Sequence, residues 1–249
     1  DAFQELSQQE AFWLDLISPS LDRVLQNISC LPRTSLSLDQ LTGLSKFFAL
    51  IIDTRSRFTA THSSGVASSA QGLAKAVGMN ADDCAKIKIA GYLHDLGKLA
   101  VPDAILQKPG KPTKEEWLII KAHPYYTHRI LERVKGLEDI TFWASNHHEE
   151  LQGGGYPFAM TADNLSLGAR TMAVADIFTA LAEDRPYREG MEKAQIEKVF
   201  QNMVRDGKLD SQVVDALFGN YKKINDERVE AQELELRGLS DFWEALRKQ

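Results

Sequence analysis

A histidine–aspartate doublet, His94-Asp95, is the stretch of this sequence best suited to chemistry. Apolar Ile87, Ala90 and Leu93 precede it at helical spacing, so the doublet lies near the end of a helix whose other face is buried. Adjacent positions on a helix point about 100° apart. His94 can therefore bind one metal ion while the two oxygens of Asp95 bridge to a second. A capped helix end with a surface histidine is the alternative for the doublet alone.

Further histidines and a second carboxylate extend the doublet to a set that suits metal ions. Imidazoles and carboxylates without cysteines favour first-row metals such as Fe, Mn, Zn, Ni or Co over Ca or Mg. The set exceeds the needs of one ion and predicts two, about 3.5 to 4 Å apart, bridged by Asp95 and by a water that loses a proton near neutral pH. The remaining histidine, His128, is predicted to be solvated and outside the set. The members are His62, His94, Asp95, His123, His147, His148 and Asp176.

Helices must position these side chains, because apolar residues recur three and four apart over most of the chain. We find no convincing strand, repeat or low-complexity tract, so the sequence predicts an all-α fold. The helical spacing is clearest in residues 8–16, 21–28, 38–52, 167–181, 193–200, 213–217 and 242–246.

Cap residues and loops locate individual helices. Asn80 begins the helix that carries the doublet, and residues 113–116 have the spacing of a capping box. The helix that follows this box is predicted to end near His123, just before Pro124. Residues 153–157 contain three glycines and a proline, which break either regular element and predict a loop.

The composition limits the class of protein. With 249 residues, 43% of them hydrophobic, the chain can bury one large core with a small appendage. A formal net charge of −6 and a pI of about 5.6 argue against a nucleic-acid duplex or an anionic membrane as the main partner. The cysteines Cys30 and Cys84 lack CxxC spacing and suit a reducing cytosol, so we expect a cytoplasmic protein. No apolar run is long enough to span a membrane. Because the sequence begins at Asp1 and not at Met, an upstream region stays an open alternative.

Several short motifs follow one another through the middle of the chain. They are HDLGK (94–98), ILQKPGK (105–111), HP (123–124), HHE (147–149), GYP (155–157), AD (175–176) and DRPYR (184–188). In this order they resemble the HD superfamily of metal-dependent phosphohydrolases and, within it, the HD-GYP domains of bacterial signalling. The resemblance covers roughly residues 55–220. It implies a helical domain that hydrolyses a cyclic dinucleotide, cyclic di-GMP or in some members 3′,3′-cyclic GMP-AMP, with two divalent metals of which Fe or Mn is expected first.

The resemblance also implies a role for each residue of the metal set. Asp95 bridges the two ions, and a hydroxide between them is the nucleophile. Lys98 corresponds to a lysine that contacts the scissile phosphate, where its charge stabilises the transition state. A surface ion pair with a nearby carboxylate is the alternative for Lys98. One metal is held by His62, His94, Asp95 and Asp176, and the other by Asp95, His123, His147 and His148.

Three residues resemble the substrate-binding residues of the family. Arg185 and Arg188 correspond to its phosphate-binding pair, and guanidinium groups suit phosphate oxygens. A salt bridge at a helix end is the alternative for either arginine. Tyr156 lies in the loop that lines the substrate groove in the family, where it stacks on or hydrogen-bonds to the dinucleotide, or else packs within the loop. The same loop is implied to contact a partner such as a diguanylate cyclase domain.

Three sites depart from the family pattern. Phe58 stands where members with three metals have a glutamate, so we predict two metals. Glu150 replaces a usual arginine beside the binding loop, which bears on substrate preference but leaves the ligands intact. Glu189 and Gly190 stand where members of the family commonly have a basic and a small residue, and this change weakens the local attraction for phosphate.

The sequence predicts three parts and leaves two other functions open. Residues 1–54 form a helical segment that packs on the core or forms a homodimer, residues 55–220 the catalytic domain, and residues 221–249 a helical extension. A catalytically weak module that binds the dinucleotide or docks a partner is one alternative, against which the complete ligand set argues. A phosphohydrolase of another nucleotide is the second, against which the GYP loop and residues 185–188 argue.

Overall fold

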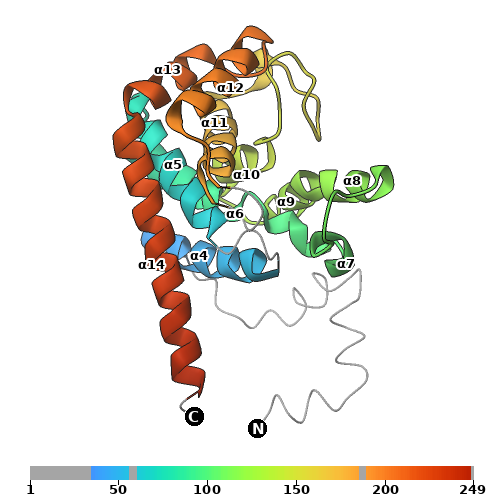
Figure 1. Ribbon diagram of the computed structural model, residues 1–249, viewed down its shortest axis with the longest axis vertical. Coiled ribbons are helices and arrows are strands. Elements are labelled where there is room, and N and C mark those ends of the chain that lie inside the picture. The colour runs from blue at the N-terminus through green and yellow to red at the C-terminus, as the bar shows by residue number, and fades with distance from the viewer. Residues whose placement is uncertain (1–34, 56–60, 185–188, 248–249) are drawn as a thin grey trace. The chain divides into compact units, whose positions relative to one another are not determined.

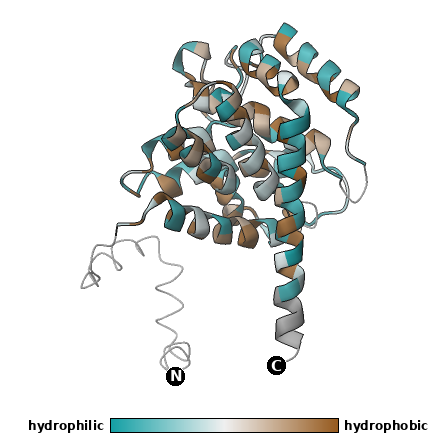
Figure 2. Cartoon of the chain, turned by 90° about the vertical axis from the view of Figure 1, so that its left-hand side faces the viewer, coloured by the Kyte–Doolittle hydropathy of each residue, from teal (hydrophilic) through white to brown (hydrophobic). Residues whose placement is uncertain are grey.

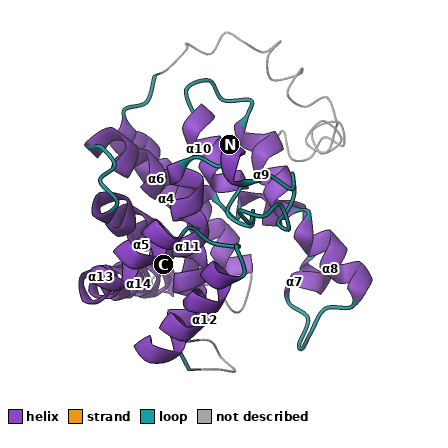
Figure 3. Cartoon of the chain, turned by 90° about the horizontal axis from the view of Figure 1, so that it is seen from above, coloured by secondary structure: helices purple, strands orange, loops and turns teal. Residues whose placement is uncertain are grey.

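The regular secondary structure that can be described is helical, which confirms the all-α prediction. The protein's structure is a computed structural model that describes residues 35–55, 61–184 and 189–247. Within these ranges an isolated bridge between Gln152 and Thr161 is the one β-type pairing. Figure 3 shows helices and loops in these ranges and no strand. The helices predicted within the first 34 residues lie outside the described residues.

The centre of the fold is an antiparallel pair of helices, α5 (His62–Ala76) and α6 (Ala81–Leu93). α5 is rich in Ala, Ser and Gly and is buried along most of its length. A Cβ atom on Gly91 of α6 would lie 2.5 Å from the Cα of Ala67 in α5, so the helices pack at a distance that a larger residue would prevent. A short turn joins them, so the start of α5 and the end of α6 lie together.

The other helices surround this pair (Figure 1). α4 (Leu38–Arg55) packs on α6, whereas α11 (Leu167–Ala182) and α14 (Tyr221–Arg247) pack on α5. Figures 1 and 3 both show α7 and α8 on the side of the fold away from α12, α13 and α14. The remaining elements are η1 (Leu96–Ala100), α7 (Asp103–Leu106), α8 (Lys114–Lys121), α9 (His123–Leu131), α10 (Glu138–Ser145), η2 (Ala162–Asn164), α12 (Lys193–Arg205) and α13 (Ser211–Gly219).

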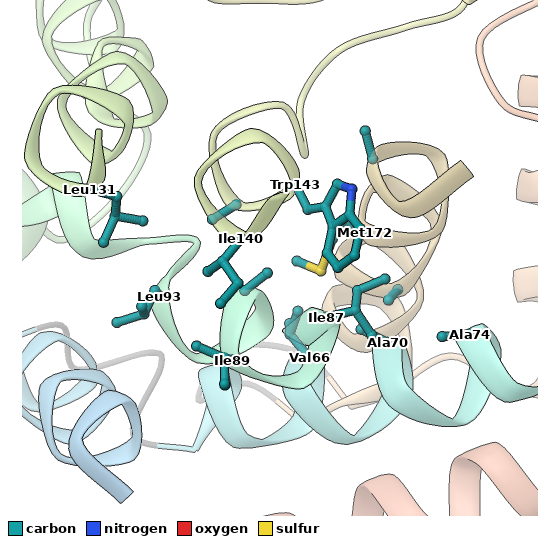
Figure 4. Close-up of a cluster of buried hydrophobic side chains, with 14 of the residues drawn as sticks. Val66, Ala70, Ala74, Ile87, Ile89, Leu93, Leu131, Ile140, Trp143 and Met172 are labelled. Atoms are coloured by element: carbon teal, nitrogen blue, oxygen red, sulfur yellow. The ribbon is translucent and has the colours of Figure 1, made fainter. Parts of the chain in front are cut away.

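Two hydrophobic clusters hold the helices together. The first joins α5, α6, α10 and α11, and Figure 4 shows Trp143 and Met172 close to Ile87 within it. Trp143 donates from Nε1 to the hydroxyl oxygen of Ser166 at 3.1 Å, so its polar atom is satisfied. The second cluster joins α5 and α11 to α12, α13 and α14, and its largest fully buried members are Phe178, Phe200, Leu73, Ile196, Leu217 and Ile224.

The predicted helix caps are present, and one helix end differs from the prediction. Asn80 accepts a hydrogen bond from the backbone N–H of Asp83 at 2.9 Å. Thr113 forms a capping box at the start of α8. His123 is the first residue of α9 and does not lie in the preceding helix, which ends at Lys121. The reason is Pro124, which has no N–H to donate and suits the first turn of a new helix.

α14 is the longest helix among the described residues, and it packs along α5. It begins at Tyr221, where the sequence analysis sets the start of a C-terminal extension. Figure 2 shows hydrophilic and hydrophobic residues interspersed along it. Among the helices searched, α14 included, none combines the length and apolar character needed to cross a membrane. The structure groups Leu38–Gln249 as one unit, and the expected division of the chain into three parts stays a prediction.

Candidate metal centre

The structure brings together all the side chains of the predicted metal set. Asp176 projects from the middle of α11, and the others stand where helices begin or end. All are buried except His148, which is partly exposed. The set converges because α5, α6, α9 and α10 each have one end at this point of the fold. The side chains are His62, His94, Asp95, His123, His147, His148 and Asp176.

A first group of ligand atoms surrounds one oxygen of Asp176. Oδ1 of Asp176 lies 3.2 Å from Nε2 of His62 and 3.8 Å from Nε2 of His94. Nε2 of His94 also lies 3.2 Å from Oδ2 of Asp95. The side chains of His62, His94 and Asp176 thus offer three ligand atoms within 4.8 Å of one another, which suits a single ion.

A second group of ligand atoms begins at His123, which contacts the other oxygen of Asp95. Nε2 of His123 lies 3.2 Å from Oδ1 of Asp95 and 3.3 Å from Nε2 of His147. Nδ1 of His148 lies 3.9 Å from Oδ2 of Asp176. The imidazoles of His123, His147 and His148 again offer ligand atoms within 4.8 Å of one another. Asp95 therefore directs Oδ2 to the first group and Oδ1 to the second, as a bridging carboxylate would.

Backbone carbonyl groups set the tautomers of three histidines. In each, Nδ1 lies within hydrogen-bond distance of the carbonyl oxygen of the residue three positions earlier. Because Nδ1–H donates there, Nε2 is the ring atom that would bind a metal when the imidazole is neutral. The distances are 2.8 Å for His94, 2.8 Å for His123 and 2.7 Å for His147.

His62 is held by a carboxylate that the sequence analysis missed. Its Nδ1 lies 3.1 Å from Oε1 and 3.2 Å from Oε2 of Glu183, a residue with 7% of its surface exposed. Glu183 directly follows α11 and lies seven residues after Asp176. A separation of two helical turns puts both carboxylates on one side of the helix. That spacing is the sequence signal that could have revealed Glu183.

Two histidines and one aspartate of the centre have protonation states that suit metal binding. Burial and the neighbouring His148 hold the pKa of His147 well below its usual range, and burial lowers the pKa of His148 to about 4. Both imidazoles are therefore neutral at pH 7. Burial opposes ionisation of Asp95, but His94 and Lys98 outweigh it and hold the pKa of Asp95 well below the usual range. Neutral imidazoles and ionised carboxylates are the forms that bind divalent metals.

His62 differs from these histidines because two carboxylates contact it. Burial favours its neutral form, yet Glu183 and Asp176 raise the pKa of His62 to about 10. In the absence of a metal the ring therefore carries two protons. A metal bound at Nε2 would displace one of them, while the proton on Nδ1 would stay in the hydrogen bond to Glu183.

Lys98 lies on η1 with its ammonium group against the centre. Nζ is 2.5 Å from Oδ2 of Asp95. Burial lowers the pKa of Lys98, but Asp95 outweighs burial and raises it, so the side chain is charged at pH 7. Arg55 at the end of α4 donates to the carbonyl oxygens of Leu99 and Val101 at 3.0 and 3.2 Å, which fixes the segment that carries Lys98.

Gly97 lets η1 approach α9 closely. A Cβ atom at this position would lie 1.9 Å from the carbonyl oxygen of His123 and 2.6 Å from the backbone nitrogen of Thr127. The N–H of Gly97 donates to Oγ1 of Thr127 at 2.9 Å, and the same hydroxyl donates to the carbonyl oxygen of His94 at 2.9 Å. These contacts fix the distance between the candidate ligands His94 and Asp95, before Gly97, and His123, after it.

The loop with the GYP motif contacts the centre through Tyr156. The ring centroid of Tyr156 lies 4.8 Å from that of His148, and Nζ of Lys121 lies 4.6 Å from the tyrosine ring. Lys121 is a second residue that the sequence analysis missed, because a contact between α8 and a distant loop leaves no local pattern. A Cβ atom on Gly155 would lie 2.4 Å from the Cα of Glu149, so the loop requires glycine there.

Glu149 binds within the loop, whereas Glu150 pairs with a residue outside it. The carboxylate of Glu149 is buried and accepts from the backbone N–H groups of Phe158 and Met160 at 2.7 and 2.9 Å. Glu150, the charge reversal noted in the sequence, lies 3.1 Å from Nζ of Lys208. An ion pair with Lys208 therefore offsets its charge.

The other sequence departures and site residues are only partly described. Gly190 donates from its backbone N–H to Oδ1 of Asp184 at 2.7 Å, and Glu189 is exposed. His128 lies outside the centre, 3.2 Å from a carboxylate oxygen of Glu132, and is partly exposed as expected for a residue outside the set. Phe58, Arg185 and Arg188 lie outside the described residues, so their roles stay predictions.

Comparisons with known proteins identify relatives of this chain. The family model of the HD domain matches residues 46–213. The 3'3'-cGAMP-specific phosphodiesterase 1 of Vibrio cholerae is 34% identical over 222 residues, which are 88% of this chain and 52% of that protein. A cyclic di-GMP phosphodiesterase of Pseudomonas aeruginosa is 36% identical over 145 residues, 58% of this chain and 35% of that protein. A crystal structure of cyclic GMP-AMP-specific phosphodiesterases of Vibrio cholerae is 28% identical with a TM-score of 0.51, and covers 88% of this chain and 50% of the other. The chain thus spans about half the length, or less, of these relatives.

The matched segment contains every candidate metal ligand described above. It extends from α4 to α13. The HD phosphohydrolase fold binds divalent metal, and the clustered histidines and aspartates fit that chemistry. The chain belongs to the HD domain family, and its motifs assign it to the HD-GYP group.

Proposed function

We propose that the chain is a phosphodiesterase that hydrolyses a cyclic dinucleotide at a centre of two divalent metals. The observation that carries the proposal is the bridging geometry of Asp95, whose two oxygens lie 3.2 Å from His94 and 3.2 Å from His123. One ion would be held by His62, His94, Asp95 and Asp176. The other would be held by Asp95, His123, His147 and His148.

The donor set supports Fe or Mn, with Ni, Co or Zn as alternatives. Imidazole and carboxylate ligands without thiolates suit these metals. Phe58 offers no ligand atom, which supports two ions and not three. Divalent metals in such a centre supply Lewis-acid polarisation of the phosphoryl group and make water a stronger nucleophile near neutral pH.

The chain's own residues would bind and orient the substrate. The ammonium group of Lys98 points at the centre and would donate to an oxygen of the scissile phosphate, where negative charge develops in the transition state. The ring of Tyr156 lies 4.8 Å from that of His148 and would contact the dinucleotide by stacking or hydrogen bonding. Arg185 and Arg188 would bind phosphate oxygens through their guanidinium groups.

The relatives support a cyclic dinucleotide as substrate and differ in which one they name. The Vibrio relative is called specific for 3'3'-cGAMP, and the Pseudomonas relative is called a cyclic di-GMP phosphodiesterase. We therefore propose both as candidate substrates. The loop of residues 153–157 would be the surface for a diguanylate cyclase partner, and residues 1–54 the segment for homodimer formation.

The test is metal analysis of the purified protein together with hydrolysis assays on cyclic di-GMP and 3′,3′-cyclic GMP-AMP, each with Mn or Fe(II). We expect about two metals per chain, the number that the bridging carboxylate predicts, and turnover of at least one substrate. Two bound metals without turnover of either substrate would refute the proposed phosphodiesterase activity and favour a module that binds the dinucleotide or a partner. A protein that binds no divalent metal would refute the proposal entirely.

A further inference from the structure

The C-terminal helix α14 reaches the metal centre although it lies outside residues 46–213, which the family model matches. Gln232 of α14 donates from Nε2 to Oε2 of Glu183 at 3.2 Å. Glu183 in turn accepts from Nδ1 of His62. A chain of hydrogen bonds therefore links α14 to the first histidine of the metal set.

The position of Gln232 is itself fixed by several contacts. Its Nε2 also lies 3.3 Å from the carbonyl oxygen of Thr61, the residue that precedes α5. Its Oε1 accepts from Arg228, a buried residue one turn earlier on α14. Donation by Nε2 and acceptance by Oε1 fix the orientation of the amide.

The fold leaves space for this contact. A Cβ atom on Gly65 would lie 2.8 Å from Nε2 of Gln232 and 2.9 Å from a methyl group of Thr179. Any larger residue at position 65 would push the amide of Gln232 away from α5. The hydrogen bonds of Gln232 therefore depend on the absence of a side chain at Gly65.

We infer that Glu183 and Gln232 are positioning residues for the metal that His62 would bind, and that α14 is thereby part of the metal centre. The inference rests on the proposed function for the presence of the metals. A carboxylate that accepts Nδ1–H of a metal-bound histidine fixes the ring and raises the basicity of Nε2, and its loss typically weakens metal affinity about 10- to 100-fold. Gln232 holds that carboxylate in place and should have a smaller effect of the same kind.

The experiment measures metal binding directly and does not depend on hydrolysis. Metal-free parent protein, Glu183→Gln and Gln232→Met are titrated with Mn²⁺ by calorimetry, and the Co²⁺ absorption spectrum of each is recorded. We expect Glu183→Gln to weaken one of the two binding events about 10- to 100-fold and to leave the other near the parent value. Gln232→Met should weaken the same event to a smaller extent. Both should change the Co²⁺ spectrum.

Glu233→Gln is the matched control, because Glu233 lies next to Gln232 on α14 and is exposed, 3.2 Å from Arg237. It should bind metal as the parent does. Thermal melting and circular dichroism establish that each variant is folded, and Gln232→Met carries the test if Glu183→Gln does not fold. Parent affinity at both sites in Glu183→Gln and Gln232→Met would overturn the inference, as would equal weakening of both events. A parent that binds no metal would overturn the proposed function and this inference together, whereas a parent that binds two metals without hydrolysis would overturn only the proposed function.

Discussion

Replacement of Gly97 by alanine should disrupt both the fold and the second group of ligands. The added Cβ atom would lie 1.9 Å from the carbonyl oxygen of His123, whereas ordinary contacts begin at 3.4 Å. η1 and α9 would have to separate by about 1.5 Å, the difference between these distances. Both contacting groups of α9 are backbone, so no side-chain rotation can relieve the clash.

The size of the effect follows from the contacts that must change. Overpacking of this kind costs about 1 to 3 kcal/mol, and loss of the hydrogen bond from Gly97 to Thr127 costs about 1 kcal/mol more. We therefore expect Gly97→Ala to lower the free energy of unfolding by about 2 to 4 kcal/mol. In a chain of this length that corresponds to a fall in Tm of roughly 4 to 16 °C.

The same substitution should weaken metal binding through His123. Nε2 of His123 lies 3.2 Å from Oδ1 of Asp95, and a displacement of about 1.5 Å would exceed the tolerance of metal–ligand distances, about 0.2 Å. We expect one of the two Mn²⁺ binding events to be lost or weakened by more than tenfold. Calorimetric titration measures this, and thermal melting measures the stability.

Gly43→Ala provides the matched control. Gly43 lies inside α4, and a Cβ atom there would meet nothing within 4 Å. Alanine should stabilise the helix by about 0.5 to 1 kcal/mol relative to glycine and should leave metal binding unchanged. If Gly97→Ala melted at the parent temperature and bound metal as the parent does, our account of the contact between η1 and α9 would be refuted.

Four further predictions concern individual side chains. Asp95→Ala should abolish metal binding and hydrolysis because both ligand groups lose their shared carboxylate, and retention of full activity in an assay would contradict the bridging role. Lys98→Ala should lower kcat by about 100- to 1000-fold while the metal content stays at the parent value. An unchanged kcat would show that Lys98 does not stabilise the transition state. Arg185→Ala should raise KM in steady-state kinetics, and an unchanged KM would show that Arg185 does not bind the substrate. The pKa of Asp210 is lowered by Arg170, 2.7 Å away, in spite of partial burial. The stability that this ion pair contributes should therefore be present above the unfolded-state pKa of about 3.9 and be lost as the pH falls through the lower folded-state pKa. Urea unfolding of the parent and of Asp210→Asn should differ at pH 7 and converge towards acid pH, and a difference that did not depend on pH would contradict this assignment.

Much of the centre could be predicted from the sequence because its determinants are local. Helical periodicity, the cap at Asn80 and the capping box at Thr113 depend on residues a few positions apart, and the structure has all three. The ligand candidates could be chosen by side-chain chemistry and by motif order. Their gathering at one point was then expected from the resemblance to a known family.

The tertiary structure alone decided how these residues are oriented. Asp95 directs one oxygen to each ligand group, Glu183 holds His62, and Gln232 reaches Glu183 from a helix outside the matched segment. Apart from the contact between the neighbours His94 and Asp95, these contacts join residues separated by tens of positions or more, so the sequence near each residue does not reveal its partner. The sequence by itself determined which side chains could bind metal and that helices would carry them. Packing between helices determined which atoms face one another, because that depends on close approaches such as the one that Gly97 permits.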